Sequence, residues 1–328
     1  MSEMSEKLWI GIDGGGTKTT AVIGDKNGHL RAVSKGSSGN LTAISPEQLY
    51  TLITDLIMQL LKNTGVALSD VETIFAAMAG ADRPEEQQKI YDAFEESPIL
   101  PKLKVQSDVH AALASGTWGK EGTLIIAGTG AILFGYQQQK TFRVGGWGYL
   151  LGDEGSGYHL GKLAIRSILK ASDEHIPLKP FQKAILEHYN ALSPHQLITK
   201  VYSNMNPVAA ISSASKLVLA AVEEDGIAKS IVKATQEELI ALIESAYTRM
   251  DCTKPVVLHG GLFSNEFFYE EFKNTVSMHF PDLMMTKPNV SGAVGAYLLA
   301  LHESKIAVND QIKQKIHQSW RLLEGEVN

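Results

Sequence analysis

The sequence predicts a two-domain, mixed α/β protein. Its 328 residues are about twice the roughly 150 residues of a typical domain. Hydrophobic residues make up 44% and charged residues 20%, which suits a chain that buries a sizeable core. Two glycine-centred hairpins, each followed by alternating helices and strands, indicate mixed sheets covered by helices. These observations exclude a disordered chain and a small disulfide-stapled one.

The two predicted hairpins follow one plan. In the first, a β-prone run at 8–12 ends in the triplet Gly14-Gly15-Gly16, and the β pattern resumes at 19–23. In the second, strands at 123–127 and 131–136 flank Gly128-Thr129-Gly130, and a third strand follows at 141–144. The repetition indicates an internal duplication, although common hairpin order would give the same pattern.

Helices separate these predicted sheets. Ser45-Pro46-Glu47-Gln48 combines an N-cap, a first-turn proline and a capping-box glutamine, and apolar residues follow at helical spacing up to Leu60. Further helices are predicted at 84–95, 158–171, 180–189, 208–223, 227–250, 265–278 and 291–303, and further strands at 73–77, 104–106, 255–258 and 283–286. We place the boundary near Thr117, which gives an N-terminal domain of 1–117 plus 304–328 and a C-terminal domain of 118–303.

Charge and cysteine content limit the partners. Thirty basic and 36 acidic residues give a net charge of −6, which disfavours binding to nucleic acid. Cys252 is the only cysteine, so the chain can form neither an internal disulfide nor a cysteine-based metal site, in agreement with a reducing cytoplasm. The N-terminus lacks a signal-peptide pattern, and no apolar run reaches the roughly 18 residues of a membrane span. We therefore expect a cytoplasmic protein without a membrane partner.

The first hairpin carries the sharpest chemical signal. Asp13 ends a strand and is followed by Gly14-Gly15-Gly16, then by the hydroxyl of Thr17 and the cation of Lys18. Such a turn lets backbone N–H groups approach phosphate oxygens. It is neither a Walker loop nor a dinucleotide fingerprint, because a strand follows it. A glycine turn without a ligand remains the alternative.

Gly128-Thr129-Gly130 stands at the equivalent place in the second hairpin. Two such turns from two domains could face one another and hold a triphosphate from both sides. A tight structural turn explains this short tripeptide equally well. Asp108, between a strand and a small-residue helix, is interpreted either as an N-cap or as a catalytic carboxylate.

A second glycine-rich region runs from Gly145 to Gly157. It holds six glycines, Trp147 and the adjacent Asp153 and Glu154 within 13 residues. Carboxylates and exposed backbone groups can bind sugar hydroxyl or acetamido groups, whereas a turn packed by the indole ring is the alternative. Farther on, Gly260-Gly261 separates a strand from a helix and suits the approach of a flat base.

Two other features have structural interpretations. The glycines and alanines at 292–296 allow close helix packing, either at a hinge or in a plain tight interface. His110, His159 and His259 adjoin these motifs, but none has a metal-ligand partner at helical spacing, so we interpret them as structural or solvated.

Taken in order, these motifs resemble those of the sugar kinase, Hsp70 and actin superfamily, and within it the N-acetylglucosamine kinase branch of the BadF/BadG/BcrA/BcrD ATPase family. The resemblance spans nearly the whole chain. It implies a two-domain actin-like ATPase fold, ribonuclease H-like, with duplicated mixed β-sheet cores flanked by helices. An N-terminal ATPase and sugar domain and a C-terminal ATPase domain would hold ATP and Mg²⁺ between them and close on the sugar.

The resemblance also implies roles for individual residues. Asp108 would be the general base, and Asp13 would hold Mg²⁺ through water. ATP would contact Gly14, Gly15, Gly16, Thr17, Lys18, Gly128, Thr129, Gly130, Gly260, Gly261 and Asn265. The N-acetylhexosamine would contact Asn40, Asp108, Gly145, Gly146, Trp147 and Asp153. The sequence around Asn40 matches the family least well.

These implications predict an ATP-dependent amino-sugar kinase that phosphorylates the 6-hydroxyl of N-acetylglucosamine. N-acetylmuramic acid, N-acetylmannosamine and glucosamine stay open as substrates. The alternative is a nucleotide-dependent sensor or activator ATPase that phosphorylates no sugar. Activators of this family bind an iron–sulfur cluster with cysteines, usually two per chain, and Cys252 alone disfavours that role. The resemblance suggests a homodimer, although no sequence pattern requires one.

Overall fold

The computed structural model describes residues 6–327. The chain divides into two compact units, which are described separately. Unit 1 comprises Met1–Lys120 and Pro288–Asn328, and unit 2 comprises Glu121–Lys287. Each unit contains one five-stranded sheet and its own helices.

Unit 1 is built on a mixed sheet with the strand order β3-β2-β1-β4-β5. Its strands are β1 (Leu8–Gly14), β2 (Thr19–Asp25), β3 (Leu30–Gly36), β4 (Val71–Met78) and β5 (Leu103–Ser107). β2 is antiparallel to both β1 and β3, whereas β1, β4 and β5 run parallel. The carboxyl ends of β1, β4 and β5 therefore lie at one edge of the sheet.

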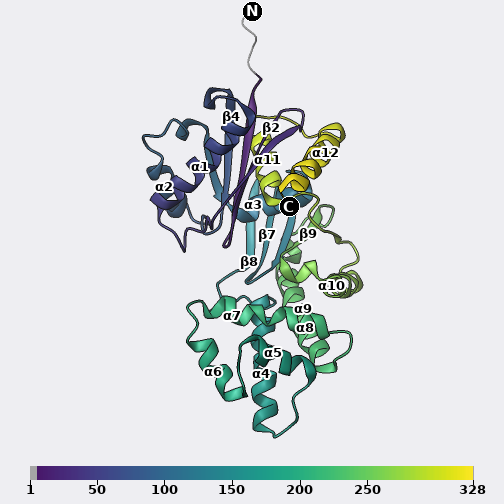
Figure 1. Cartoon of the computed structure of the whole chain (residues 1–328). Coiled ribbons are helices and arrows are strands. Elements are labelled where there is room, and N and C mark those ends of the chain that lie inside the picture. Colours follow the sequence, from purple (N-terminus) through teal and green to yellow (C-terminus); the bar gives the residue numbers. More distant parts are fainter. Residues whose placement is uncertain (1–5, 328) are drawn as a thin grey trace, which may run out of the picture. The chain divides into compact units, whose positions relative to one another are not determined.

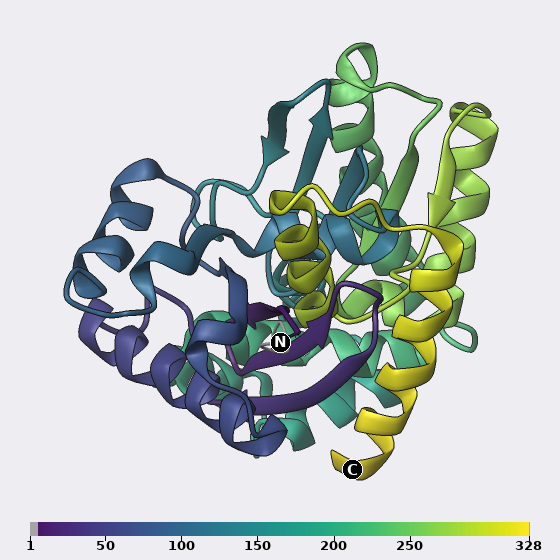
Figure 2. The same cartoon turned by 90° about the horizontal axis from the view of Figure 1, so that it is seen from above.

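Helices cover both faces of this sheet (Figures 1 and 2). They are α1 (Pro46–Thr64), α2 (Pro84–Ala93), α3 (Asp108–Thr117), α11 (Gly292–Glu303) and α12 (Asp310–Val327), with short 3₁₀ helices at Leu68–Asp70 and Leu100–Lys102. Alternate β1 side chains divide between the faces. Leu8, Ile10 and Ile12 pack with α1 and α2, whereas Trp9 packs with α11 and α12.

The position of α11 corrects the predicted domain boundary. We assigned 288–303 to the C-terminal domain, but these residues belong to unit 1. α11 packs directly on β1, since a Cβ added at Gly11 would lie 2.1 Å from the backbone nitrogen of Tyr297. A Cβ at Gly295 would likewise lie 2.1 Å from the Ala111 carbonyl oxygen. The small residues of α11 thus form a tight interface, and the chain returns to unit 1 earlier than predicted.

Unit 2 repeats the topology of unit 1. Its sheet has the order β10-β9-β6-β7-β8. The strands are β6 (Gly122–Ala127), β7 (Ala131–Gln137), β8 (Lys140–Gly145), β9 (Pro255–His259) and β10 (Met284–Thr286). β7 is antiparallel to β6 and β8, whereas β6, β9 and β10 are parallel. Reading β6 to β10 as β1 to β5 gives the same order and directions, which confirms the predicted duplication of the sheets.

The helices of unit 2 pack around a separate hydrophobic core. They are α4 (Gly157–Asp173), α5 (Pro180–His188), α6 (Pro194–Tyr202), α7 (Pro207–Ser213), α8 (Ser215–Ala221), α9 (Gly226–Ala246) and α10 (Glu266–His279), with 3₁₀ helices at Tyr247–Arg249 and Gly261–Ser264. The single helix predicted at 208–223 is divided at Ala214, where backbone bonds span three residues. Strand β3 and helices α6 and α12 were not predicted. Within the described 6–327, no helix combines the length and apolar character of a membrane span.

Candidate active site

In unit 1, the glycine turn after β1 is ordered by backbone hydrogen bonds. The Gly15 N–H donates to the Lys18 carbonyl at 3.0 Å, and the Gly39 N–H donates to the Gly15 carbonyl at 3.2 Å. Gly16, Thr17 and Lys18 are exposed. The turn thus presents backbone, a hydroxyl and a cation to solvent, a combination suited to an anion.

Asp13 lies half-buried beside the N-terminus of α11. A Cβ on Gly292, the first residue of α11, would lie 2.2 Å from the Asp13 Oδ2 atom, so only glycine leaves room for this carboxylate. Burial and the nearby Asp108 raise the pKa of Asp13 from 3.8 to about 6, partly offset by Lys18. A buried carboxylate with this pKa favours a nearby cation or a proton.

Asp108 is the first residue of α3, and Ser107 is the N-cap. The N-cap role considered for Asp108 is therefore wrong. Its half-buried carboxylate accepts a 3.2 Å hydrogen bond from the Ser107 hydroxyl. Burial, followed by the nearby Asp82, raises the pKa of Asp108, and the hydrogen bond from Ser107 opposes this shift. A raised pKa makes this carboxylate a stronger base.

Asp82 lies near Asp108 and was not among the predicted site residues. It follows β4, just as Asp13 ends β1 and Asp108 follows β5. Since these parallel strands end at one edge, all three carboxylates gather there. Only the strand order of the sheet places Asp82 near Asp13 and Asp108, and a single sequence does not reveal that order.

Asn40 lies near the glycine turn of unit 1. Its Oδ1 atom accepts hydrogen bonds from the Thr42 N–H and hydroxyl, both at 3.0 Å. Its Nδ2 atom lies 4.0 Å from the place that a Cβ on Gly16 would take. The amide is thus held with its nitrogen toward the turn, in the same unit as Asp13 and Asp108.

In unit 2, the Gly128-Thr129-Gly130 turn is held by the N-terminus of α4. The Gly157 N–H donates to the Gly128 carbonyl at 2.7 Å, and the Tyr158 N–H donates to the Thr129 carbonyl at 3.3 Å. Thr129 itself is exposed. The turn therefore keeps its shape while its hydroxyl stays accessible.

The Gly260-Gly261 segment lies next to this turn because β6 and β9 pair in parallel. Gly260 has φ +106°, and a Cβ there would lie 2.5 Å from the Ala127 carbonyl oxygen. Gly261 is exposed. Asn265 is the N-cap of α10, since its Oδ1 atom accepts from the Phe268 N–H at 2.9 Å. Its side-chain oxygen thus has a structural role.

Asp153 lies beside Gly130. A Cβ on Gly130 would be 2.9 Å from the Asp153 Oδ2 atom, and Asp153 Oδ1 accepts from the Ala131 N–H at 3.5 Å. Asp153 adopts φ +64°, a left-handed conformation uncommon outside glycine. Burial raises the pKa of its carboxyl group. The carboxylate is thereby fixed next to the glycine turn.

Gly145, the last residue of β8, and the following Gly146 have φ of +71° and +68°. The Arg143 Nη2 group donates to the carbonyl oxygens of Gly145 at 3.2 Å and Gly146 at 2.7 Å. Its guanidinium also lies 4.6 Å from the centre of the Trp147 ring. Trp147 is 65% exposed, and it also lies against its own loop, since a Cβ on Gly152 would be 3.5 Å from the Trp147 Cδ1 atom.

The three histidines near these motifs are partly buried. Burial lowers the pKa values of His110, His159 and His259, which keeps these rings neutral near pH 7. The His159 Nδ1 atom accepts from the Gly155 N–H at 3.2 Å. No group of three potential metal ligands occurs between residues 6 and 327.

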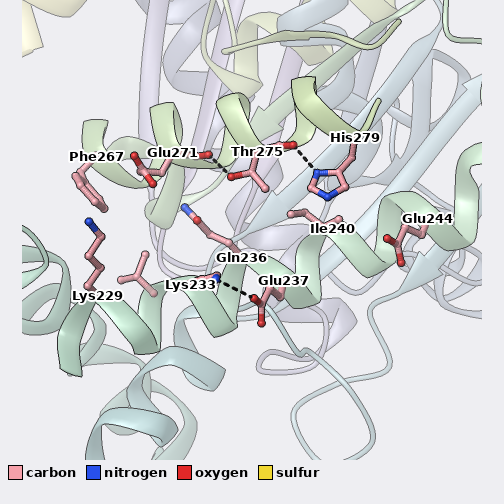
Figure 3. A pocket seen from close by; sticks show the side chains of 11 residues that line it. Lys229, Lys233, Gln236, Glu237, Ile240, Glu244, Phe267, Glu271, Thr275 and His279 are labelled. Atoms are coloured by element: carbon pink, nitrogen blue, oxygen red, sulfur yellow. Dashed lines mark hydrogen bonds and ion pairs between the residues drawn. The ribbon is translucent and has the colours of Figure 1, made fainter. Parts of the chain in front are cut away.

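A cavity of about 560 Å³ lies between α9 and α10 of unit 2 (Figure 3). Side chains of both signs line it, among them Lys229, Lys233, Glu237 and Glu271. Gln236 reaches between the helices and donates to the Phe268 carbonyl at 2.9 Å. None of the predicted site residues lines this cavity.

Comparison with known proteins identifies the relatives of this chain. Residues 10–300 match the model of the BadF/BadG/BcrA/BcrD ATPase family. The chain belongs to this family. It is 32% identical to an N-acetylmuramic acid/N-acetylglucosamine kinase of Clostridium acetobutylicum, over 90% of this chain and 99% of that protein. It is 29% identical to an N-acetyl-D-glucosamine kinase of Dictyostelium discoideum, over 92% of this chain and all of that protein.

The fold of this chain is similar to that of a solved crystal structure. A crystal structure proposed to be an N-acetylglucosamine kinase from Chromobacterium violaceum matches with a TM-score of 0.73 and 24% identity, over 90% of this chain and 99% of that one. At this identity the likeness concerns the fold alone. Together with the duplicated sheets, it confirms the predicted actin-like ATPase fold.

The carboxylates of unit 1 fit a magnesium ion accompanied by a nucleotide. Mg²⁺ usually keeps several waters and takes one or two carboxylates together with substrate phosphates. Asp13, with Asp108 raising its pKa, offers such a carboxylate beside a glycine turn suited to phosphate. A divalent cation there would offset the cost of burying two negative charges.

The closeness of Gly292 to Asp13 gives a first test. In Gly292→Ala, the added methyl group would collide with the carboxylate, and we expect kcat/KM for Mg·ATP to fall by about 10- to 100-fold. Gly226→Ala is the matched control, because Gly226 is also the first residue of a helix and its Cβ would meet nothing within 4 Å. Equal kinetics of the two variants would contradict a role for the Asp13 position.

Proposed function

We propose that this protein is an ATP-dependent amino-sugar kinase that transfers the γ-phosphate to the 6-hydroxyl of an N-acetylhexosamine, with N-acetylglucosamine as the leading substrate. One observation carries the proposal: Asp108 and Asp13 gather at the strand edge that bears an exposed glycine turn, in a chain of an ATPase family. The relatives named as kinases of N-acetylglucosamine and N-acetylmuramic acid support the choice of acceptor.

In this reaction, Asp108 accepts the proton of the attacking hydroxyl. The sugar oxygen forms a bond to the γ-phosphorus, the bond between that phosphorus and the β,γ-bridging oxygen breaks, and ADP leaves. The raised pKa of Asp108 increases its strength as a base. We assign the 6-hydroxyl because it is a primary alcohol, the least hindered acceptor of the sugar.

The nucleotide contacts are proposed by position. Backbone groups of Gly14 to Lys18 and of Gly128 to Gly130 would bind phosphates, and Gly260, Gly261 and Asn265 would lie beside the adenosine. Mg²⁺ at Asp13 would neutralise charge that develops on the phosphates. That the turn of unit 1 and the turn of unit 2 hold the same triphosphate stays a prediction.

The sugar contacts are also proposed by position. Asn40 and Asp108 in unit 1, and Gly145, Gly146, Trp147 and Asp153 in unit 2, would bind hydroxyl and acetamido groups. The exposed indole of Trp147 offers an apolar face.

We further propose that the protein acts in the cytoplasm and, following its family resemblance, as a homodimer.

The test is ADP release by the full chain with Mg·ATP and each candidate sugar. We expect stimulation by N-acetylglucosamine of about 100-fold or more over ATP alone, since water is a poor competitor in an organised phosphoryl-transfer site. N-acetylmuramic acid, N-acetylmannosamine and glucosamine distinguish the acceptor. A 6-deoxy sugar is the matched control, because it retains the other groups but lacks the attacking oxygen.

The competing function is a nucleotide-dependent sensor or activator. It would hydrolyse or bind ATP with no dependence on any of these sugars. ATP binding without sugar-stimulated ADP release would therefore replace the kinase proposal by this alternative.

A further inference from the structure

Ser107 departs from the behaviour of the other serine N-caps in the described chain. Ser45, Ser156, Ser193 and Ser291 each accept a hydrogen bond from the third backbone N–H of their helix. Ser107 occupies the N-cap of α3 but makes no such bond. A serine cap typically contributes about 1 kcal/mol to helix stability. The Ser107 side chain thus makes other contacts instead of capping.

The Ser107 hydroxyl donates to the Asp82 Oδ1 atom. Its oxygen also lies 3.2 Å from the Asp108 Oδ1 atom. Ser107 is 3% exposed, so its hydroxyl has little access to water. A hydroxyl has one proton, and it cannot be donated fully to both carboxylates at once.

The loop that bears Asp82 is well fixed. Met78 pairs with Ser107 across β4 and β5, which brings the start of this loop beside α3. The Ala81 N–H donates to the Met78 carbonyl at 3.1 Å, and the Gln87 Nε2 group of α2 donates to the Ala81 carbonyl at 2.9 Å. Asp82 is exposed to solvent as a residue, but the fold places one of its carboxylate oxygens against the buried Ser107 hydroxyl.

We propose that Asp82 is a positioning residue for Asp108: it competes with Asp108 for the hydrogen bond that the Ser107 hydroxyl donates, and so leaves the Asp108 carboxylate more available to receive the proton of the substrate hydroxyl. This inference rests on the proposed role of Asp108 as the base. Without Asp82, the Ser107 hydroxyl would turn to Asp108 Oδ1 and stabilise its charged form, which weakens the base. The negative charge of Asp82 acts in the same direction, because it raises the pKa of Asp108.

Other charged and titratable groups lie near this cluster. Asp13 of β1 is close enough for Asp108 to raise its pKa, which Lys18 lowers. His110 of α3 contacts the Ser107 carbonyl through Nδ1 at 3.2 Å, and burial keeps its pKa low. The Ser107 hydroxyl donates to the carboxylates of Asp82 and Asp108.

The first measurement is the kinetics of Asp82→Ala in the full chain. We expect kcat with N-acetylglucosamine to fall about tenfold, a fraction of the effect of losing a general base, while KM for sugar and for ATP stay within about twofold. Glu85→Ala is the matched control, because it removes an exposed carboxylate from the adjoining first turn of α2. A fall in Asp82→Ala that appears in KM alone would overturn the proposal.

The decisive measurement is a rescue. Removing the misdirected hydroxyl in Asp82→Ala/Ser107→Ala should restore kcat to within about threefold of Ser107→Ala alone, because the two residues act through one proton. If Asp82 only stabilised the local structure, the double variant would be less active than either single variant. A double variant no faster than Asp82→Ala would overturn the inference.

The two proposals fail in different ways. Wild-type protein without sugar-stimulated ADP release would refute the kinase function. An active wild type with an unaffected Asp82→Ala variant would refute only the role of Asp82.

Discussion

Replacing Asp108 by asparagine should lower kcat for sugar phosphorylation by a factor of about 100 or more. The amide has nearly the same shape as the carboxylate and keeps an oxygen that can lie 3.2 Å from the Ser107 hydroxyl, which also donates to Asp82. It cannot accept a proton from the sugar hydroxyl at neutral pH. Binding of ATP should stay within about threefold, since the loss concerns the transition state alone.

This prediction is measured by steady-state ADP release and by equilibrium nucleotide binding on the same preparation. Asp55→Asn makes the same chemical change on the exposed side of α1 and should leave both measurements unchanged. If Asp108→Asn retained near-normal turnover, Asp108 could not be the base. If it lost ATP binding as well, the residue would act mainly in the ground state.

The fold was largely predictable because its signals are local. The capping box at Ser45 was predicted, and Ser45 and Gln48 form both of its hydrogen bonds. The glycine turns were recognised because a strand precedes and follows each of them. Such features depend on neighbouring residues only, and for that reason sequence reading identifies them.

The errors concern contacts between distant segments. Nothing within α11 indicates which sheet it packs on, and its place on β1 is decided by the close approach at Gly11. The predicted helix at 208–223 is divided at Ala214, although no proline or glycine marks a break. These outcomes depend on packing, which a propensity pattern does not encode.

The candidate site shows the same division. Asp13 and Asp108 stood next to recognisable motifs, so the sequence indicated them. Asp82 stands next to no such motif. Its contact with Ser107 exists only because β4 and β5 pair. The role of Gly292 likewise depends on the approach of α11 to Asp13. Residue type and local order predicted the motifs, but only the sheet order explains why these side chains meet.

Asp13→Asn should stabilise the ligand-free protein and at the same time abolish magnesium-dependent turnover. The folded-state pKa of Asp13 is raised from 3.8 to about 6, so the folded protein binds this proton more tightly than the unfolded chain does. The free energy of unfolding therefore decreases as the pH rises through the window between these values. Above pH 6 the folded protein bears the full free-energy cost of an ionised Asp13 carboxylate. The Asp13→Asn change removes this charge and should raise the free energy of unfolding by about 1 to 3 kcal/mol.

Urea unfolding at pH 7.5 and at pH 4 measures this effect without any nucleotide. The gain of Asp13→Asn over wild type should be largest at pH 7.5 and should shrink toward pH 4, where the wild-type carboxyl is protonated in the folded state. Asp55→Asn, on the exposed side of α1, should show no such gain. Addition of Mg·ADP should then raise the Tm of wild type but not of Asp13→Asn, because the neutral amide is a weak magnesium ligand. If Asp13→Asn is destabilised at pH 7.5, or if it keeps the magnesium-dependent Tm shift, Asp13 is not the carboxylate that binds Mg²⁺.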